Sequence, residues 1–252
     1  MRAFEFLDKF DTLDASTMVI DKGLGYSYVE DMLKVCGNYF NFIKYGWGTS
    51  ILCDDKIVQQ KNEVYESYDI RSYTGGTLFE LANKQGKIDE YFDEVDRLGF
   101  TAIEISDGST VISQDVRDEL IKKAKSLGFY TLSEIGKKNP EKDHEYSIDT
   151  RIELIKKDIA SGSDMVIIEG RESGKNIGIY DDKGNIKFDE LKQISESVTP
   201  DRIMWEAPNK NQQIDLILNL GNDVNIGNVN VADIISLETL RRGLRGDTLG
   251  KV

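Results

Sequence analysis

Several acidic side chains follow short apolar runs in a pattern that suits metal or enolate chemistry. The residues are Asp21, Glu104, Glu134, Glu169 and Glu206. If each run is a β-strand, alternation places the carboxylate on the same face as the residue two positions earlier, so several carboxylates converge at one end of a barrel. Unpaired buried carboxylates are too costly to persist. They therefore need a cation, which is either a metal ion or the lysines and arginines of neighbouring strands.

The scarcity of nitrogen and sulfur ligands decides which metal would fit. His144 is the only histidine, and Cys36 and Cys53 are single thiols without a CxxC spacing. A metal bound here would be held by oxygen, which favours Mg²⁺, with Mn²⁺ second, over zinc. We take Asp21, Glu104, Glu169 and Glu206 as candidate metal ligands. The competing interpretation is that the glutamates are only salt-bridged to lysines.

Two lysines are candidates for catalysis. Lys44 lies between Ile43 and Tyr45 in an apolar run, where a lysine is expensive unless it is paired or used. Lys137 follows a glycine at the end of another run, so a similar role is expected. Its neighbour Lys138 is expected to be solvated.

Other residues at the ends of the runs could hold anions. Gly75 and Gly76 precede the helical stretch LFELANK, and amide N–H groups at a helix N-terminus can bind an anion. The basic side chains supply charged partners for phosphate, sulfonate or carboxylate groups. The candidate substrate-binding residues are Lys22, Gly75, Gly76, Arg171, Lys175, Asn228, Arg241 and Arg245.

We expect the elements that position these residues to form a single (β/α)8 TIM barrel over residues 1–252. Strands are expected near 16–21, 40–46, 68–74, 100–106, 129–135, 164–169, 202–207 and 223–228. The motif-bearing end of each run is its C-terminal end, where such barrels carry their active sites, and helical patterns lie between the runs. Residues 1–15 are expected to cap the barrel bottom. The segment 171–188 is expected to be a loop or hairpin insertion.

Composition excludes some classes of partner. The 252 residues carry a formal net charge of -13, which argues against nucleic acid or an anionic membrane as a partner. No stretch is apolar enough to span a bilayer, and acidic residues interrupt the N-terminal segment where a signal peptide would need an apolar core. We expect a cytoplasmic homo-oligomer that acts on small anionic compounds.

Seven strings together resemble the phosphosulfolactate synthase family, from about Asp21 to the C-terminus. They are FIKYGWGTS, GGTLFE, EISDGS, SEIGKK, IIEGRESG, EAPNK and SLETLRRGLRGDT. The resemblance implies a (β/α)8 barrel and Mg²⁺-dependent addition of sulfite to phosphoenolpyruvate, which gives (2R)-phospho-3-sulfolactate on the methanogen route to coenzyme M. It implies a general acid that protonates C2, for which Lys137 and Lys44 are the candidates, with Glu134 or a water in reserve.

The sequence is also compatible with two other functions. One is another barrel lyase or aldolase acting on a phosphorylated enol or keto acid, in which Lys44 would form a Schiff base. The other is a non-catalytic, stress-associated protein on the same barrel.

Overall fold

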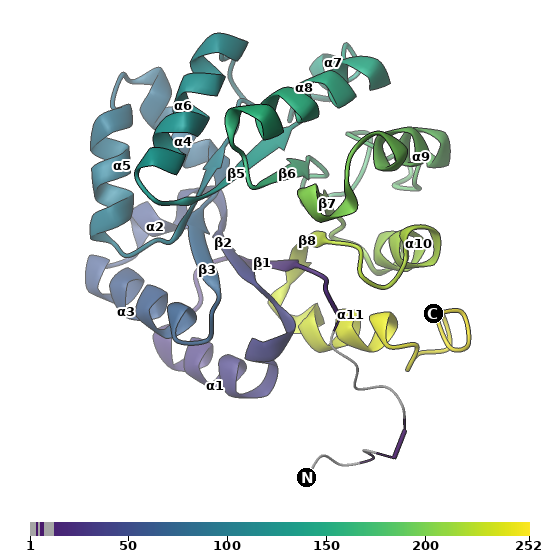
Figure 1. Ribbon diagram of the computed structural model, residues 1–252. Coiled ribbons are helices and arrows are strands. Elements are labelled where there is room, and N and C mark those ends of the chain that lie inside the picture. Colours follow the sequence, from purple (N-terminus) through teal and green to yellow (C-terminus); the bar gives the residue numbers. More distant parts are fainter. Residues whose placement is uncertain (1–3, 5, 8–12) are drawn as a thin grey trace.

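The computed structural model describes residues 4, 6–7 and 13–252, and in this part of the chain eight parallel strands form one sheet (Figure 1). The strands are β1 (Thr17–Asp21), β2 (Phe42–Tyr45), β3 (Arg71–Thr74), β4 (Ala102–Ile105), β5 (Tyr130–Ile135), β6 (Met165–Ile168), β7 (Ile203–Glu206) and β8 (Ile226–Asn230). The predicted strands lie at all eight positions. The expected cap over residues 1–15 falls largely outside the described residues.

The sheet curls into a nearly closed barrel. Its order is β3-β2-β1-β8-β7-β6-β5-β4, and β1 pairs in parallel with both β2 and β8. The two end strands, β3 and β4, approach each other at the bottom, where the Thr101 N–H donates to the Ser72 carbonyl at 3.1 Å. The fold is therefore a single (β/α)8 barrel, as the sequence predicts.

Helices alternate with the strands and cover the outside of the barrel (Figure 1). The α-helices are α1 (Tyr26–Cys36), α2 (Thr49–Leu52), α3 (Asp55–Glu66), α4 (Gly76–Lys84), α5 (Ile88–Arg97), α6 (Gln114–Ser126), α7 (Pro140–Asp143), α8 (Ile148–Ser161), α9 (Phe188–Ser197), α10 (Lys210–Leu220) and α11 (Ile234–Arg241). Short 3₁₀ turns are η1 (Gly37–Tyr39), η2 (Gly46–Gly48), η3 (Pro200–Arg202) and η4 (Val231–Asp233).

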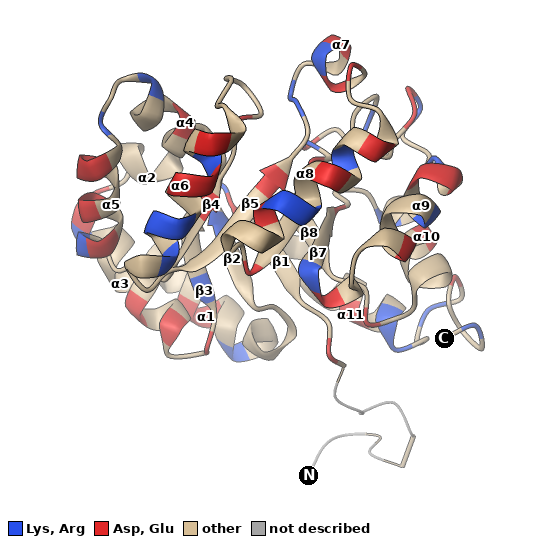
Figure 2. Cartoon of the chain, turned by 45° about the horizontal axis from the view of Figure 1, so that its top comes forward, with Lys and Arg blue, Asp and Glu red and all other residues tan. Residues whose placement is uncertain are grey.

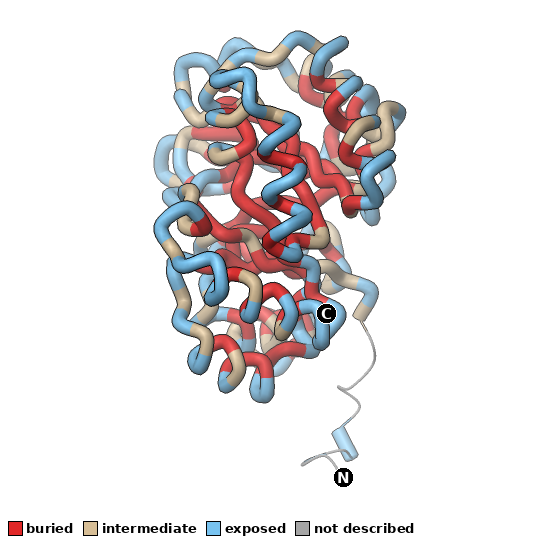
Figure 3. The backbone as a smooth tube through the Cα atoms, turned by 90° about the vertical axis from the view of Figure 1, so that its left-hand side faces the viewer, coloured by how far each residue is buried: buried red, intermediate tan, exposed pale blue. Residues whose placement is uncertain are grey.

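Nearly all strand residues are buried, whichever face of the sheet their side chains occupy, and Figure 3 shows buried residues through the interior of the molecule. Alternate residues point into the barrel, where Met18, Phe42, Leu132, Ile167 and Met204 form a compact inner core. The other face packs against the helices in a second, larger core. This double burial explains why the strands read as continuous apolar runs.

Charged residues are concentrated on the helices (Figure 2). Helix α5 carries Asp89 and Glu90 in its first turn, on its exposed side, where they favour the positive end of the helix dipole. Among the described residues, no helix combines the length and apolarity needed to cross a bilayer.

The two longest loops at the C-terminal mouth are tied together by one buried carboxylate. Asp143, in α7 after β5, accepts the Gly178 N–H at 2.8 Å and pairs with Arg151 at 2.7 Å. Gly178 belongs to the long segment after β6, in which Tyr180 and Ile186 form an antiparallel bridge. The loops over the mouth are thus anchored to each other and to the helix layer.

Candidate active site

Four glutamate side chains converge inside the C-terminal mouth of the barrel, and each is at most 2% exposed. They lie at the ends of β4, β5, β6 and β7: Glu104, Glu134, Glu169 and Glu206. As strand alternation predicts, each continues an inward face that begins lower in the barrel with Ala102, Leu132, Ile167 or Met204. The structure therefore brings together four of the five expected carboxylates.

Lys44 lies in the middle of this cluster. Its Nζ is 2.9 Å from Glu104 Oε2, 3.3 Å from Glu206 Oε1 and 3.4 Å from Glu134 Oε2, and 12% of the side chain is exposed. Burial alone would lower the pKa of Lys44, but these three carboxylates raise it well above its ordinary value. The lysine is therefore an ammonium ion that supplies fixed positive charge.

The glutamates differ in their affinity for protons. Burial raises the pKa of Glu104 to about 7 although Lys44 acts in the opposite direction. Burial, with Glu134 and Glu206, raises the pKa of Glu169 well above its ordinary value. Burial acts the same way on Glu134, but Lys44 and Lys138 hold its pKa below the ordinary value. The cluster thus holds more negative charge than its surroundings compensate.

Three of the glutamates have the donor set of a cation site. Among the described residues, one carboxylate oxygen from each of Glu134, Glu169 and Glu206 lies within 4.8 Å of the others. Within the described part of the chain, Glu134 Oε1 and Glu169 Oε2 are buried and have no hydrogen-bond donor. The ammonium groups of Lys44 and Lys138 lie near the four glutamates, and the raised pKa values of Glu104 and Glu169 favour protonated carboxyl groups at these two positions when no further cation is bound. Buried carboxyl oxygens that can exchange such protons for a cation fit a hard divalent ion.

Glu104 and Asp21 do not belong to this trio. Glu104 Oε1 accepts the Gly76 N–H at 2.7 Å, and its other oxygen faces Lys44. Asp21 lies on the opposite face of β1 from Ile20, so it points away from the barrel interior. There it pairs with Lys61 and accepts two backbone N–H groups. The expectation that Asp21 is a metal ligand is corrected: this carboxylate fixes the turn after β1.

The amide groups of the Gly-Gly turn are already in use. The Gly75 N–H donates to the Tyr45 carbonyl at 2.9 Å, and the Gly76 N–H donates to Glu104. A Cβ on Gly76 would lie 2.3 Å from Glu104 Oε1, so a side chain would displace the carboxylate. The N-terminus of α4 therefore holds an anion of the protein itself, while both glycines still line the pocket over the cluster.

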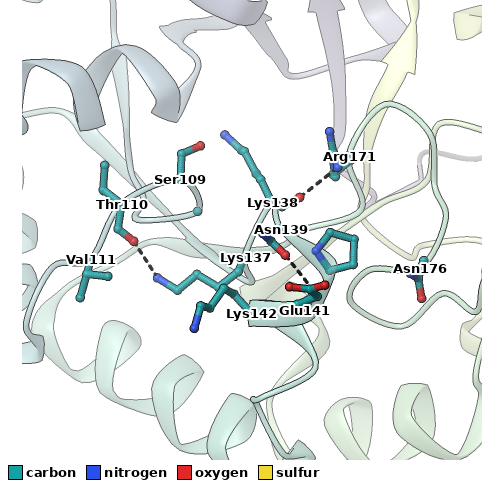
Figure 4. A pocket seen from close by; sticks show the side chains of 12 residues that line it. Ser109, Thr110, Val111, Lys137, Lys138, Asn139, Glu141, Lys142, Arg171 and Asn176 are labelled. Atoms are coloured by element: carbon teal, nitrogen blue, oxygen red, sulfur yellow. Dashed lines mark hydrogen bonds between the residues drawn. The ribbon is translucent and has the colours of Figure 1, made fainter.

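The two adjacent lysines after β5 point in different directions (Figure 4). Lys137 Nζ donates to Asp107 Oδ2 at 2.5 Å, to the Asp107 carbonyl at 2.8 Å and to the Thr110 carbonyl at 3.2 Å. Lys138 Nζ donates to Thr77 Oγ1 at 2.9 Å. All three N–H groups of Lys137 are thus bound to the segment after β4, whereas Lys138 keeps donors for a ligand.

Two pockets with shared lining residues open above the glutamates. The inner one, of about 200 Å³, is lined by Lys44, Lys138 and three glutamates of the cluster, together with Glu172, Trp47 and Asn228. The outer one, of about 1010 Å³, lies between the segments after β4, β5 and β6 and is lined by Lys137, Lys138, Lys142 and Arg171 (Figure 4). Lys138 and Arg171 line both, so a ligand that spans the two meets cations on its way to the carboxylates.

Arg171 and Asn228, two of the predicted anion-binding residues, line the inner pocket, and Lys22 contacts two of its lining residues without lining it. Arg171 has a φ of 56°, and its Nη1 donates to the Lys138 carbonyl at 2.9 Å. Asn228 is 7% exposed with a φ of 57°, and its Oδ1 has no hydrogen-bond donor among the residues that the structure describes. Lys22 pairs with Glu172 and lies 4.8 Å from the centre of the Trp47 ring. Positive φ is uncommon for arginine but is adopted more readily by asparagine, so the Arg171 backbone in particular is held by its surroundings.

The remaining basic candidates lie elsewhere. Arg241 is 1% exposed, and its Nη1 donates to the carbonyls of Asn222 and Val224, which precede β8 at the bottom of the barrel. Arg245 donates to Ser236 Oγ on the outer helix α11. Lys175 is exposed and lines neither the inner nor the outer pocket. The expectation that Arg241 binds substrate is therefore corrected, because its charge holds the barrel floor.

Two residues at the mouth are missing from the sequence prediction. Lys138 was expected to be solvated, but 29% of its side chain is exposed and it lines both pockets. Glu80, on α4, is 2% exposed and accepts hydrogen bonds from Ser106, Ser109 and Thr110. The position of Glu80 in the string GGTLFE could have indicated its role. An acidic residue on the buried side of a short helix needs hydrogen-bond donors from neighbouring segments.

The fold and the site define a class of protein, a (β/α)8 barrel enzyme with its chemistry at the C-terminal mouth. Residues 12–247 match the model of the (2R)-phospho-3-sulfolactate synthase (ComA) family. The chain is 52% identical to the phosphosulfolactate synthase of Methanocaldococcus jannaschii over 252 residues, which is 100% of both chains. It is 46% identical to that of Methanothermobacter thermautotrophicus, over 100% of this chain and 99% of the relative. The chain belongs to the phosphosulfolactate synthase family.

Solved structures with little sequence identity share the fold. The 3-hexulose-6-phosphate synthase of Salmonella typhimurium is similar with a TM-score of 0.54 and 16% identity, over 94% of each chain. At this identity the likeness extends to the barrel alone.

Proposed function

We propose that this enzyme adds sulfite to phosphoenolpyruvate with the help of Mg²⁺, giving (2R)-phospho-3-sulfolactate. The observation that carries the proposal is the trio Glu134, Glu169 and Glu206, whose oxygens approach within 4.8 Å, beside the ammonium of Lys44. Addition of sulfite to C3 moves the double-bond electrons to C2 and into the carboxylate. The dianion that results needs concentrated positive charge at one place.

The trio is the set of residues that would hold Mg²⁺. A bound Mg²⁺ would supply positive charge to the developing aci-carboxylate. Glu104 would remain outside the metal site, where it orients Lys44 and accepts the Gly76 N–H. Lys44 would add a second, fixed charge next to the metal ligands.

The anionic groups of the substrates need partners outside this cluster. Lys138 and Arg171 line both pockets and carry charges that the glutamates do not fully use. Asn228, on the same wall, donates through Nδ2 to the Arg171 carbonyl at 3.3 Å and so helps to position that residue. We assign Lys138 and Arg171 to the phosphate and sulfite groups. Charge-assisted contacts of this kind are about twice as strong as neutral hydrogen bonds.

The proton for C2 comes from Lys137 in this proposal. Its ammonium borders the outer pocket and is held by Asp107 and Thr110. Release of the 3.2 Å bond to the Thr110 carbonyl would free one N–H for the carbanion while Asp107 keeps the group in place. General acid catalysis of this kind typically contributes about 10²–10⁴-fold.

A mass assay tests the proposal. Purified protein is incubated with phosphoenolpyruvate, sulfite and Mg²⁺, with omission of each component in turn as controls. Phosphosulfolactate should form only in the complete mixture. Its absence from a correctly folded preparation would favour a non-catalytic role on the same barrel.

The Schiff-base alternative has a separate test. The three carboxylates around Lys44 keep it protonated, and an ammonium ion is a poor nucleophile. Borohydride reduction in the presence of a keto acid such as pyruvate, whose carbonyl can form a Schiff base, should therefore leave the mass of the protein unchanged. A stable adduct on Lys44 would instead indicate an aldolase-type mechanism.

A further inference from the structure

A buried chain of charged groups runs from the outer helices to Lys137. It begins at Asp158 on α8, which accepts from Nε of Arg117 at 2.9 Å and from Nη2 at 2.6 Å. Arg117, on α6, donates through Nη1 to Asp107 Oδ1 at 3.3 Å. The second oxygen of Asp107 accepts from Lys137 Nζ at 2.5 Å. Each oxygen of Asp107 thus faces one cation.

The geometry of Arg117 goes beyond what an ion pair requires. The side chain is 3% exposed and that of Asp158 is fully buried. Nη2 of Arg117 also donates to the Glu134 carbonyl at 2.8 Å. One rigid guanidinium therefore fixes two segments at once: the residue that holds Lys137 and the strand end that carries a glutamate of the cluster. Lysine could not do this, because it lacks the planar fork of donors.

The backbone of Lys137 is fixed separately. Its N–H donates to Asp143 Oδ1 at 2.8 Å, and Asp143 pairs with Arg151 in the helix layer. The side chain is left to the contacts with Asp107 and Thr110. With the backbone anchored, loss of Arg117 would move the ammonium without unfolding the loop.

We propose that Arg117 is a positioning residue for the reaction: through Asp107 it holds the ammonium of Lys137 at a set distance from the glutamate cluster. The inference rests on the proposed function, in which Lys137 protonates C2. Arg117 itself is 3% exposed and lines neither the inner nor the outer pocket. A buried ion pair contributes little net stability compared with apolar packing. Stability alone therefore does not explain the burial of Arg117 and Asp158, whereas fixing the position of the Lys137 ammonium does.

The test compares kcat with KM in matched variants. Arg117→Met removes the guanidinium and keeps much of the side-chain volume. We expect kcat to fall by about 10- to 100-fold, the range associated with small misplacements of catalytic groups, and KM for both substrates to change by less than about 3-fold. Arg117→Lys should recover only part of kcat. Arg202→Met is the control, because Arg202 donates to backbone carbonyls at Ser163 and Asp164 at the barrel bottom.

A second variant guards against failure of Arg117→Met to fold. Asp107→Asn leaves the Arg117–Asp158 pair intact and weakens only the link to Lys137, so it should show the same fall in kcat. A double-mutant cycle with Lys137→Met then separates positioning from general damage. In the Lys137→Met background, Asp107→Asn should have almost no further effect, because the group that it positions is gone.

The outcomes test the proposed function and the role of Arg117 separately. If the wild-type enzyme forms no phosphosulfolactate, the proposed function is wrong and the inference fails with it. If the wild-type enzyme is active and kcat is unchanged in Arg117→Met and Asp107→Asn, the inference alone is overturned. The inference is also overturned if Asp107→Asn lowers kcat as much in the Lys137→Met background as in the wild-type enzyme. Arg117 and Asp107 would then act on the stability of the fold.

Discussion

The ammonium of Lys44 lies 2.9 Å from a carboxylate oxygen of Glu104, and the other oxygen of Glu104 accepts the first amide of helix α4. This one contact joins β2 to β4 across the barrel and fixes a positive charge at the base of the inner pocket. The same ammonium lies 3.4 Å from Glu134 and 3.3 Å from Glu206, so one lysine offsets charge on three of the four glutamates. The relationship explains why a lysine and four carboxylates can be buried at one end of the same barrel.

Replacement of Lys137 should stop the protonation step. We expect Lys137→Ala to lower kcat by at least about 10²-fold with the fold intact, the usual contribution of a general acid. Lys44→Ala should impair charge stabilisation instead. Exposed Lys157, paired with Glu153 on α8, gives the control Lys157→Ala. Steady-state kinetics and circular dichroism measure both effects. Wild-type kcat in both Lys137→Ala and Lys44→Ala would remove lysine from the proton transfer and point to water or Glu134.

Stability should fall as pH rises in the absence of metal. The pKa of Glu104 is about 7 in the folded chain, above its ordinary value of 4.5. The folded chain therefore keeps a proton that the unfolded chain releases. The stability contributed by this proton is present below about pH 4.5 and is lost between about 4.5 and 7, by up to about 1.4 kcal/mol per pH unit. Urea titrations across this range should show the slope, and Glu104→Gln should flatten it.

Mg²⁺ should stabilise the fold more as pH rises, because it binds deprotonated carboxylates and the pKa of Glu169, one of its expected ligands, is raised well above the ordinary value. The rise in Tm on addition of Mg²⁺ should be larger at pH 8 than at pH 5. The double variant Glu134→Gln, Glu169→Gln should lose most of it. An equal rise at both pH values, or none, would count against a metal site in the trio.

Arg171 should act on substrate affinity. Arg171→Ala removes a cation that lines both pockets, and we expect KM for phosphoenolpyruvate or sulfite to rise by about 10- to 150-fold, which corresponds to about 1.5–3 kcal/mol. Because the φ of residue 171 is 56°, Arg171→Asn is a second variant that tolerates this backbone. Lys183→Ala, in the exposed turn of the same loop, is the control. Unchanged KM values for both substrates would make Arg171 a residue of the loop structure.

Arg241 should matter for folding and not for catalysis. Its two backbone carbonyl partners precede β8, and Arg241→Met would leave them without a donor. We expect the free energy of unfolding to drop by about 2–4 kcal/mol, with KM unchanged. Urea titration and steady-state kinetics on the same preparation check both statements. A raised KM with normal stability would return Arg241 to the substrate site.

Strand alternation predicted the centre of the site but failed where the backbone leaves the strand. Glu104, Glu134 and Glu206 lie within regular strands, so their inward direction follows from the residues two positions before. Gly136 has a φ of 135°, which takes the chain out of the alternation. The directions of Lys137 and Lys138 after it could not be read from the sequence.

Other errors arose from tertiary context. Asp21 belongs to the outward face of β1, which the alternation with Ile20 already implies. Arg241 ends a helix that starts near the mouth, and the length of that helix carries it to the barrel floor. The Arg117–Asp107 link joins residues from a helix and a loop, and no local pattern marks it.

A ³¹P NMR time course tests the central claim most directly. The protein is mixed with phosphoenolpyruvate and Mg²⁺, and sulfite is added after a baseline is recorded. The account predicts that the phosphoenolpyruvate signal gives way to a new phosphate ester only after sulfite is added, with no release of inorganic phosphate and with arrest by a chelator. An unchanged phosphoenolpyruvate signal, or its conversion to inorganic phosphate, would contradict it.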